Sequence, residues 1–247
     1  MKAIRFIFLT ILICFPSIII SSQSIAEQLK FSRVKAAYNK HQIFIKNILK
    51  LHNANLEQYE LHLQCFKAEK EIEVWIKPKA KKQFLFLYTI PICAASGTYG
   101  PKERQGDNQV PEGCYAITIY NPYSSYHLSM FIDYPNKADK SRTKTENRGG
   151  AIYIHGNCVS IGCLAIGNEE IEKLYLLSIG GQGPATIHIY PSRQLMSSLF
   201  LENKLLNFST KFYPFWMSLA KVYAYFQEYH QLPKLTYDAM GNYLIAD

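Results

Sequence analysis

The sequence predicts a mainly β fold of the α+β class, with helical segments at both ends of the chain. Residues 60–66 and 71–77 alternate between apolar and polar side chains, and a period of two is typical of strands that bury one face. Residues 32–51 instead repeat their apolar side chains at i, i+4 and i+7, which indicates a helix. Residues 209–230 also have a helical pattern and are rich in aromatic side chains.

The rest of the chain supplies further strands and one internal helix. Residues 77–82 form a basic turn, which we interpret as a solvated hairpin tip, and residues 97–108 form a long loop punctuated by glycine. Residues 167–178 indicate a helix with Asn168 as N-cap and acids in its first turn. The remaining strand-like runs, including a closing hairpin segment, are 84–93, 114–120, 126–132, 151–155, 185–190 and 241–245.

The N-terminus has the features of a secretory signal peptide. Lys2 and Arg5 precede an apolar run of 15 residues, Phe6 to Ile20, whereas a membrane-spanning helix needs roughly 20. The small-residue pattern that ends at Ala26 predicts cleavage after that residue. We therefore expect residues 1–26 to be removed, and a periplasmic protein without a stable membrane anchor.

The chain is basic, with a formal net charge of +8 that falls to +6 when Lys2 and Arg5 are removed. Such a charge suits the anionic bacterial envelope and would attract nucleic acid equally well. Charge alone therefore identifies no partner. With 48% hydrophobic residues, the chain can bury one sizeable core.

Cysteine usage points to a reactive thiol. Cleavage after Ala26 leaves an odd number of cysteines, namely Cys65, Cys93, Cys114, Cys158 and Cys163. Cysteines tend to pair in an oxidising compartment, so the one left over is a candidate nucleophile. Several could equally be buried thiols, and the sequence does not determine which of them pair.

The segment whose residues most clearly indicate catalysis is 151–167. An apolar strand ends at His155 before a glycine turn, and Cys163 follows eight residues later. The thiolate is the nucleophilic form of cysteine, and a free thiol is mostly protonated at neutral pH, so a nearby base such as His155 is required. Gly162 lets the backbone bend, which leaves successive N–H groups free to face a developing oxyanion.

The same residue types allow other interpretations. Cys158 lies three residues from His155 and is a rival nucleophile, while His127 in the run 126–132 is a rival base. For His127, a histidine held inside a sheet is the more common case. A metal site of His155, Cys158 and Cys163 lacks the fourth ligand that structural zinc takes, and we predict no metal.

Several runs together resemble one known family. IHG followed by SxGC is similar to the YkuD family of L,D-transpeptidase catalytic domains, and more closely to its YafK-like branch. The resemblance covers roughly residues 30–247. The runs that carry it are FKAEKEIEVW (66–75), GPKERQGDNQVPEG (100–113), YHLSMFIDYPN (126–136), IHGNCVSIGC (154–163) and YFQEYHQLP (225–233).

The resemblance implies a division of the chain. A YkuD-like β-sandwich catalytic domain is expected at residues 60–191. It would follow an N-terminal helical segment at residues 27–59. A C-terminal helical extension at residues 192–247 is expected to pack on this domain.

The resemblance also implies a chemistry. Family members form a thioester from the diaminopimelate carbonyl of a tetrapeptide stem, release D-alanine, and pass the acyl group to an amine or to water. On this chain the nucleophile would be Cys163 and the base would be His155. The backbone carbonyl of Gly156 would orient the imidazole. The residues expected to supply oxyanion-hole N–H groups are Ile161, Gly162 and Cys163. Those expected to contact substrate are Ser160, His127, Lys102 and Arg104, although basic loop residues are more often only solvated.

Two departures from the family pattern leave the reaction outcome open. Ile161 stands where most members have a second histidine, and Ala165 where arginine or asparagine is usual. A transpeptidase, an L,D-carboxypeptidase and an amidase that releases peptidoglycan-linked lipoprotein are all compatible. A non-catalytic peptidoglycan-binding module is disfavoured because His155 and Cys163 are both retained. The expected partners are peptidoglycan stem peptides and such a lipoprotein, with no nucleic acid and no cofactor.

Overall fold

A computed structural model describes residues 24–202 and 210–246. Residues 1–23 of the expected signal peptide lie outside these ranges. The expected cleavage point after Ala26 falls within a short helix, α1 (Ile25–Gln28), which Ser24 caps. Within the two described ranges, no helix combines the length and apolar character needed to cross a bilayer.

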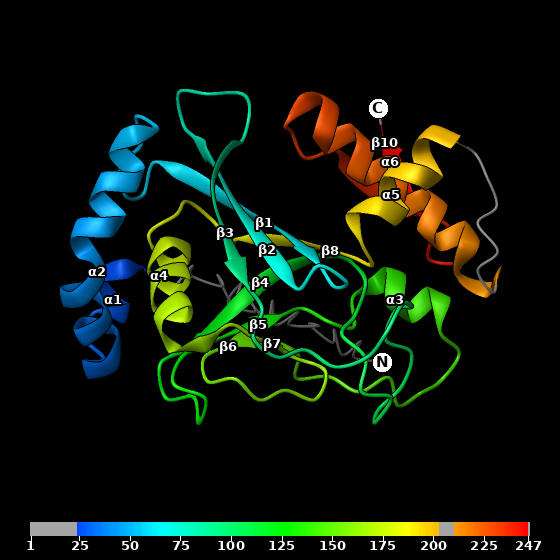
Figure 1. Cartoon of the computed structure of the whole chain (residues 1–247), viewed down its shortest axis with the longest axis horizontal. Coiled ribbons are helices and arrows are strands. Elements are labelled where there is room, and N and C mark those ends of the chain that lie inside the picture. The colour runs from blue at the N-terminus through cyan, green and yellow to red at the C-terminus, as the bar shows by residue number, and fades with distance from the viewer. Residues whose placement is uncertain (1–23, 203–209, 247) are drawn as a thin grey trace, which may run out of the picture.

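The centre of the fold is an eight-stranded mixed sheet in the order β3-β2-β1-β8-β4-β5-β6-β7 (Figure 1). The pairs β1–β8 and β6–β7 are parallel, and the other pairs are antiparallel. The strands are β1 (Tyr59–Phe66), β2 (Glu71–Pro78), β3 (Leu85–Pro91), β4 (Gly113–Asn121), β5 (Ser129–Ile132), β6 (Tyr153–His155), β7 (Leu164–Ala165) and β8 (Thr186–Tyr190). The α+β class predicted from the sequence is confirmed.

The sheet curls because β4 belongs to two halves. Residues Gly113 to Ala116 pair with β8, and from Ile117 onward the strand pairs with β5, with a register shift between Ile117 and Ile119. Such a bulge increases local twist and bends the strand. Beyond β3, Ala94 then forms an isolated bridge with Ala165 of β7. The expected sandwich is therefore one continuous curled sheet, and its two end strands approach each other at Ala165.

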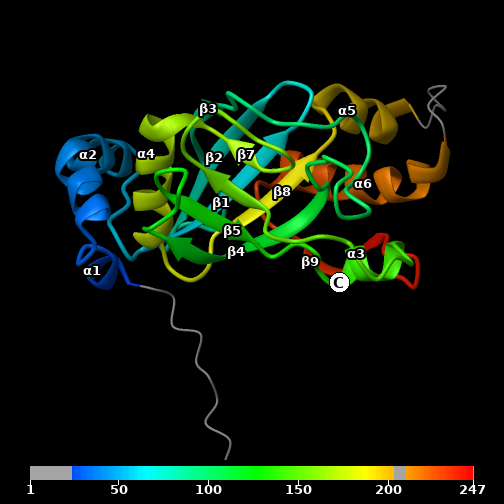
Figure 2. The same cartoon turned by 90° about the horizontal axis from the view of Figure 1, so that it is seen from below.

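The alternation in the sequence predicted the buried face correctly. The side chains of Ile72, Val74 and Ile76 in β2 are fully buried in the main core. A long helix, α2 (Ser32–Leu51), packs against α4 (Gly167–Ile179) on one side of the sheet (Figures 1 and 2). Apolar burial of this kind stabilises a fold by about 25 cal/mol per Å² of buried area.

A second hydrophobic cluster lies at the other side of the sheet. Here α5 (Arg193–Glu202) and α6 (Tyr213–Tyr229), which follows a short 3-10 turn (Thr210–Phe212), pack near the ends of β1 and β8 (Figure 2). The closing hairpin is present as β9 (Lys234–Tyr237) and β10 (Tyr243–Ala246). Trp216 of α6 donates its indole N–H to Glu112 at 2.7 Å, and this carboxylate also accepts from Gly100 N.

Three local expectations differ from the structure. The strand expected at 126–132 begins only at Ser129, because residues before it form a turn in which His127 has φ of +72°. Asn168 is not the N-cap of α4, which begins at Gly167; its side chain instead accepts a hydrogen bond from Asn157 N. A helix that was not expected, α3 (Lys137–Arg142), begins with a capping box between Asn136 and Asp139.

Candidate functional site

Strand pairing brings the two motif residues to one face of the sheet. In the parallel pair β6–β7, Ile154 lies opposite Leu164 and His155 opposite Ala165. Successive side chains point to opposite faces, and Ile154 and Leu164 are fully buried in the core. Cys163 directly precedes β7, so the alternation extended by one residue puts its side chain on the same side as that of His155.

His155 is fixed by its own turn. Its side chain is only 3% exposed, and Nδ1 lies 2.6 Å from the carbonyl oxygen of Gly156. With Nδ1–H donating to that carbonyl, Nε2 is left as the acceptor. Burial lowers the pKa of His155, and the Gly156 carbonyl partly opposes that shift by favouring the charged ring. A neutral imidazole that can accept a proton is the result.

Cys163 is half-buried and protonated at rest. Its thiol can donate to the Ala151 carbonyl at 3.7 Å. Burial raises the pKa of Cys163, while the backbone N–H of Tyr153 and the charge of Lys102 act in the opposite direction. A thiol in this state reacts only when a base removes its proton.

A disulfide removes the rival nucleophile. Cys158 is bonded to Cys93, with their Cα atoms 5.5 Å apart, and the free cysteines of the described residues are Cys65, Cys114 and Cys163. Cys93 N–H also donates to the Ala165 carbonyl at 2.9 Å. The loop between His155 and Cys163 is thus fastened to the segment that follows β3. The sequence left this pairing open.

Two of the expected oxyanion donors are engaged within the protein. Gly162 N–H donates to Ser96 Oγ at 2.6 Å, and Cys163 N–H donates to Ser160 Oγ at 2.9 Å. The Ser160 hydroxyl in turn donates to the Cys163 carbonyl at 2.7 Å, so Ser160 closes the turn. The side chain of Ile161, the third expected residue, is 79% exposed.

The predicted basic loop residues differ from each other. Lys102 is buried, its Nζ lying 2.6 Å from Asp107 Oδ1 and 3.0 Å from the Arg104 carbonyl. Lys102 is thus not simply solvated, and its expected contact with substrate stays a prediction. Arg104 is exposed. The Asp107 carboxylate also accepts from three backbone N–H groups of this loop, those of Glu103, Arg104 and Gln109, so the loop is ordered around the Lys102 ion pair.

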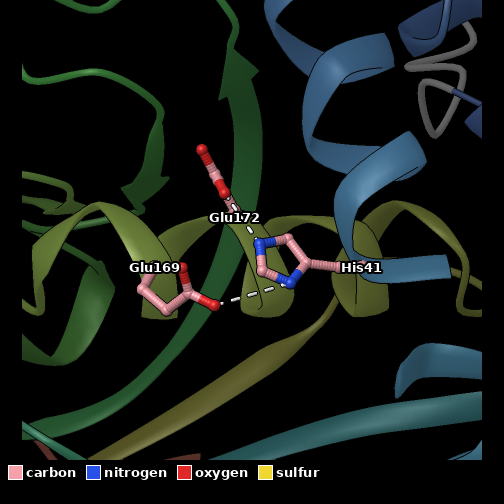
Figure 3. Close-up of side chains that lie close together, drawn as sticks. All are labelled: His41, Glu169 and Glu172. Atoms are coloured by element: carbon pink, nitrogen blue, oxygen red, sulfur yellow. Dashed lines mark hydrogen bonds and ion pairs between the residues drawn. The ribbon is translucent and has the colours of Figure 1, made fainter. Parts of the chain in front are cut away.

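His127 is not held inside the sheet, which corrects the more common interpretation of it. It lies in the turn before β5, and its Nε2 is 2.7 Å from Glu172 Oε1. Glu172 belongs to α4 and also contacts His41 Nε2 at 2.7 Å, next to Glu169 (Figure 3). One side-chain nitrogen or oxygen atom from each of His41, Glu169 and Glu172 could bind a metal ion, and these atoms lie within 4.8 Å of one another. The ammonium of Lys40 contacts both carboxylates, so a cation of the protein already offsets part of their charge.

A cavity of about 250 Å³ opens beside the SxGC turn. Ser96, which holds Gly162 N–H, is one of its lining residues, together with Lys67, Lys70, Gly97, Tyr99 and Pro191. Sequence reasoning missed Ser96 because it is 66 residues from Gly162 and lies in a loop with no recognisable pattern.

Comparison with known proteins identifies the family. The L,D-transpeptidase catalytic domain family, YkuD, matches residues 69–181. The protein named "Putative L,D-transpeptidase YafK" of Escherichia coli strain K12 is 32% identical over 192 residues, which is 75% of this chain and 74% of that protein. The chain belongs to the YkuD family. The same identity and coverage hold for the YafK protein of Escherichia coli O157:H7.

The YkuD match includes both motif residues, His155 and Cys163, and leaves β1, β8 and the terminal helices outside it. Among solved structures, the helical cell shape determining protein Pgp2 of Campylobacter jejuni is 18% identical, with a TM-score of 0.44 over 78% of this chain and 79% of that one. The L,D-transpeptidase 1 of Mycobacterium tuberculosis is 12% identical, with a TM-score of 0.30 over 53% and 63%. We infer no residue role from these remote likenesses.

Proposed function

We propose that the protein is a peptidoglycan L,D-transpeptidase-type cysteine enzyme in which Cys163 is the nucleophile and His155 its base. The observation that supports this proposal is the pairing of β6 with β7, because His155 ends β6 and Cys163 directly precedes β7, while His155 Nδ1 lies 2.6 Å from the Gly156 carbonyl. Nε2 is then the atom that takes the thiol proton. Both groups are neutral at rest, so His155 has to take the Cys163 proton before or as the sulfur attacks.

The acyl transfer proceeds through a thioester. The Cys163 thiolate attacks the diaminopimelate carbonyl of a tetrapeptide stem, and the proton held by His155 passes to the departing amino group of D-alanine. An amine or water then attacks the thioester, with His155 as base, and Cys163 is released. No cofactor takes part in these steps.

The oxyanion of each tetrahedral intermediate needs preorganised donors. We assign this role to the N–H groups of Ile161, Gly162 and Cys163. Gly162 N–H and Cys163 N–H currently donate to Ser96 and Ser160 hydroxyls. These hydroxyls can rotate away or share the donors when the oxyanion develops.

The test is incubation of envelope-purified protein with a disaccharide tetrapeptide and with a tetrapeptide-linked lipoprotein fragment, followed by mass analysis. A new cross-link indicates transpeptidation, water-dependent loss of D-alanine indicates a carboxypeptidase, and a freed lipoprotein indicates an amidase. Cys163→Ala should abolish the reaction, whereas Cys114→Ala, at another free cysteine, should retain it. Tight binding without any turnover would overturn the proposal in favour of a binding module.

The chain in the same preparation should begin at Glu27 if the protein is exported by cleavage after Ala26.

A further inference from the structure

An aromatic ring covers the imidazole of His155. The ring centroids of Tyr126 and His155 lie 4.7 Å apart, with the planes inclined by 35°. His155 is 3% exposed beneath this ring, whereas Tyr126 itself is 45% exposed. The Tyr126 ring thus covers part of the imidazole, and its exposure makes it a suitable position for substitution.

The turn that carries Tyr126 is fastened to the N-terminal helix. Nη1 of Arg33, in α2, contacts the carbonyl oxygens of Pro122 at 3.1 Å and Ser124 at 2.9 Å, and also that of His127. A guanidinium bonded to backbone carbonyls holds the path of the chain rather than any one side chain. Arg33 therefore fixes the turn on both sides of Tyr126.

Two further contacts fix the same turn from α4 and β6. His127, the residue after Tyr126, is bonded to Glu172, which is also bonded to His41 of α2 (Figure 3). The Tyr126 carbonyl lies so close to Gly156 that an added Cβ there would be 2.7 Å from it. The turn thus packs directly on the residue whose carbonyl orients His155.

We infer that Tyr126 is a positioning residue for His155, and that Arg33 of α2 acts through it. The inference rests on the proposed role of His155 as base. Rotation of the imidazole away from the Gly156 carbonyl requires the Tyr126 ring to move. The ring therefore holds the imidazole in the orientation in which Nδ1 faces the Gly156 carbonyl, and it keeps water off the imidazole. The N-terminal helix is in this way part of the catalytic apparatus, although it contributes no reacting group.

The test compares Tyr126→Ala with Tyr126→Phe and with Tyr123→Ala, which removes a 77% exposed tyrosine from the same turn. Misplacing a reacting group by about 1 Å can lower a rate by about 10²-fold. We expect Tyr126→Ala to lower kcat at least roughly tenfold with little change in KM. Tyr126→Phe, which keeps the ring, and Tyr123→Ala should behave like the wild type.

A second readout does not depend on turnover. The His155 imidazole is titrated by NMR, its resonance assigned with His155→Gln. Burial lowers the pKa of His155, so admitting water in Tyr126→Ala should raise the titration midpoint. The inference is overturned if that midpoint and kcat both equal those of the wild type. If no variant turns over any substrate but the midpoint moves, the proposed function fails and the positioning role stands.

Arg33→Ala provides an independent check. Because Arg33 acts through Tyr126, the double variant Arg33→Ala/Tyr126→Ala should lose little more kcat than Tyr126→Ala alone. Fully multiplicative losses would show that Arg33 does not act through Tyr126. Circular dichroism confirms the fold of each variant, and Tyr126→Ala alone suffices for the test if Arg33→Ala does not fold.

Discussion

The protein should lose stability in mild acid through a histidine buried between the sheet and α6. His188 is 4% exposed, its Nδ1 is 3.1 Å from the Tyr190 hydroxyl, and its ring lies 4.6 Å from that of His62. Burial lowers the pKa of His188 to about 3, against about 6.5 in an unfolded chain. Burial, and next the charge of His188, lower the pKa of His62 well below its usual value too.

Proton linkage gives the direction and the size of the change in stability with pH. Below pH 6.5 the unfolded chain binds a proton at His188, whereas the folded protein stays neutral there until about pH 3. Stability is therefore full above pH 6.5 and falls as the pH drops towards 3. For His188 the loss is about 2 kcal/mol at pH 5, a large part of the roughly 5–15 kcal/mol that stabilises a typical domain.

Urea unfolding at pH 7.5 and pH 5.0 measures this loss. His188→Gln should reduce the difference in unfolding free energy between the two pH values by about 2 kcal/mol, whatever its effect at pH 7.5. His52→Gln, at the C-cap of α2, is the matched control and should leave the difference as in the wild type. An unchanged difference in His188→Gln would show that His188 is not the group that titrates on unfolding.

Three further predictions concern the site. In His155→Ala, alkylation of Cys163 by iodoacetamide should slow by about 10²–10⁴-fold near neutral pH. The rate should partly recover at high pH, where hydroxide ionises the thiol. If peptide mass analysis gives equal rates for the variant and the wild type at all pH values, His155 is not the base. Replacing Cys93 and Cys158 together by serine should lower the unfolding free energy by about 2–4 kcal/mol. It should also lower kcat, because the loop before Cys163 loses its attachment. A non-reducing peptide map of the wild type that lacks the 93–158 link would contradict this. Gly156→Ala places a Cβ 2.6 Å from Asn168 Oδ1 and 2.7 Å from the Tyr126 carbonyl. In denaturant and activity assays it should destabilise the protein by about 1–3 kcal/mol and impair turnover. Gly150→Ala, with no atom within 4 Å of the new Cβ, should have neither effect.

Local patterns predicted much of the fold, because strand alternation and helical spacing depend on near neighbours in the sequence. The buried side chains of β2 and the last strand, β10, were found in this way, whereas its hairpin partner β9 was not. The capping box at Asn136 was an available local signal that marked α3. At Asn168, the same local reasoning failed because its side chain bonds Asn157 instead of capping α4.

The supports of the candidate site were not predictable, because they join distant segments. Cys93 and Cys158 are 65 residues apart, and Arg33 is 94 residues from His127. Nothing in the local sequence marks Tyr126 as the ring that covers His155 or Ser96 as the acceptor of Gly162 N–H. The motif therefore led to the proposed reacting groups, and only the three-dimensional packing shows what holds them.

The approach of the two ends of the curled sheet has a consequence for folding. The strand that joins the β1–β3 half to the β4–β7 half is β8, which comes last in sequence among the eight. Its pairing with both β1 and β4 is long-range, and contacts of that kind form slowly. The disulfide and the Ala94–Ala165 bridge lie where the sheet ends meet, so both join the segment after β3 to the β6–β7 region. The β4–β7 half carries His155 and Cys163, whereas Cys93 and Ser96, which hold the loop around Cys163, follow β3. The supports of the proposed site therefore join parts of the sheet that are far apart in the sequence.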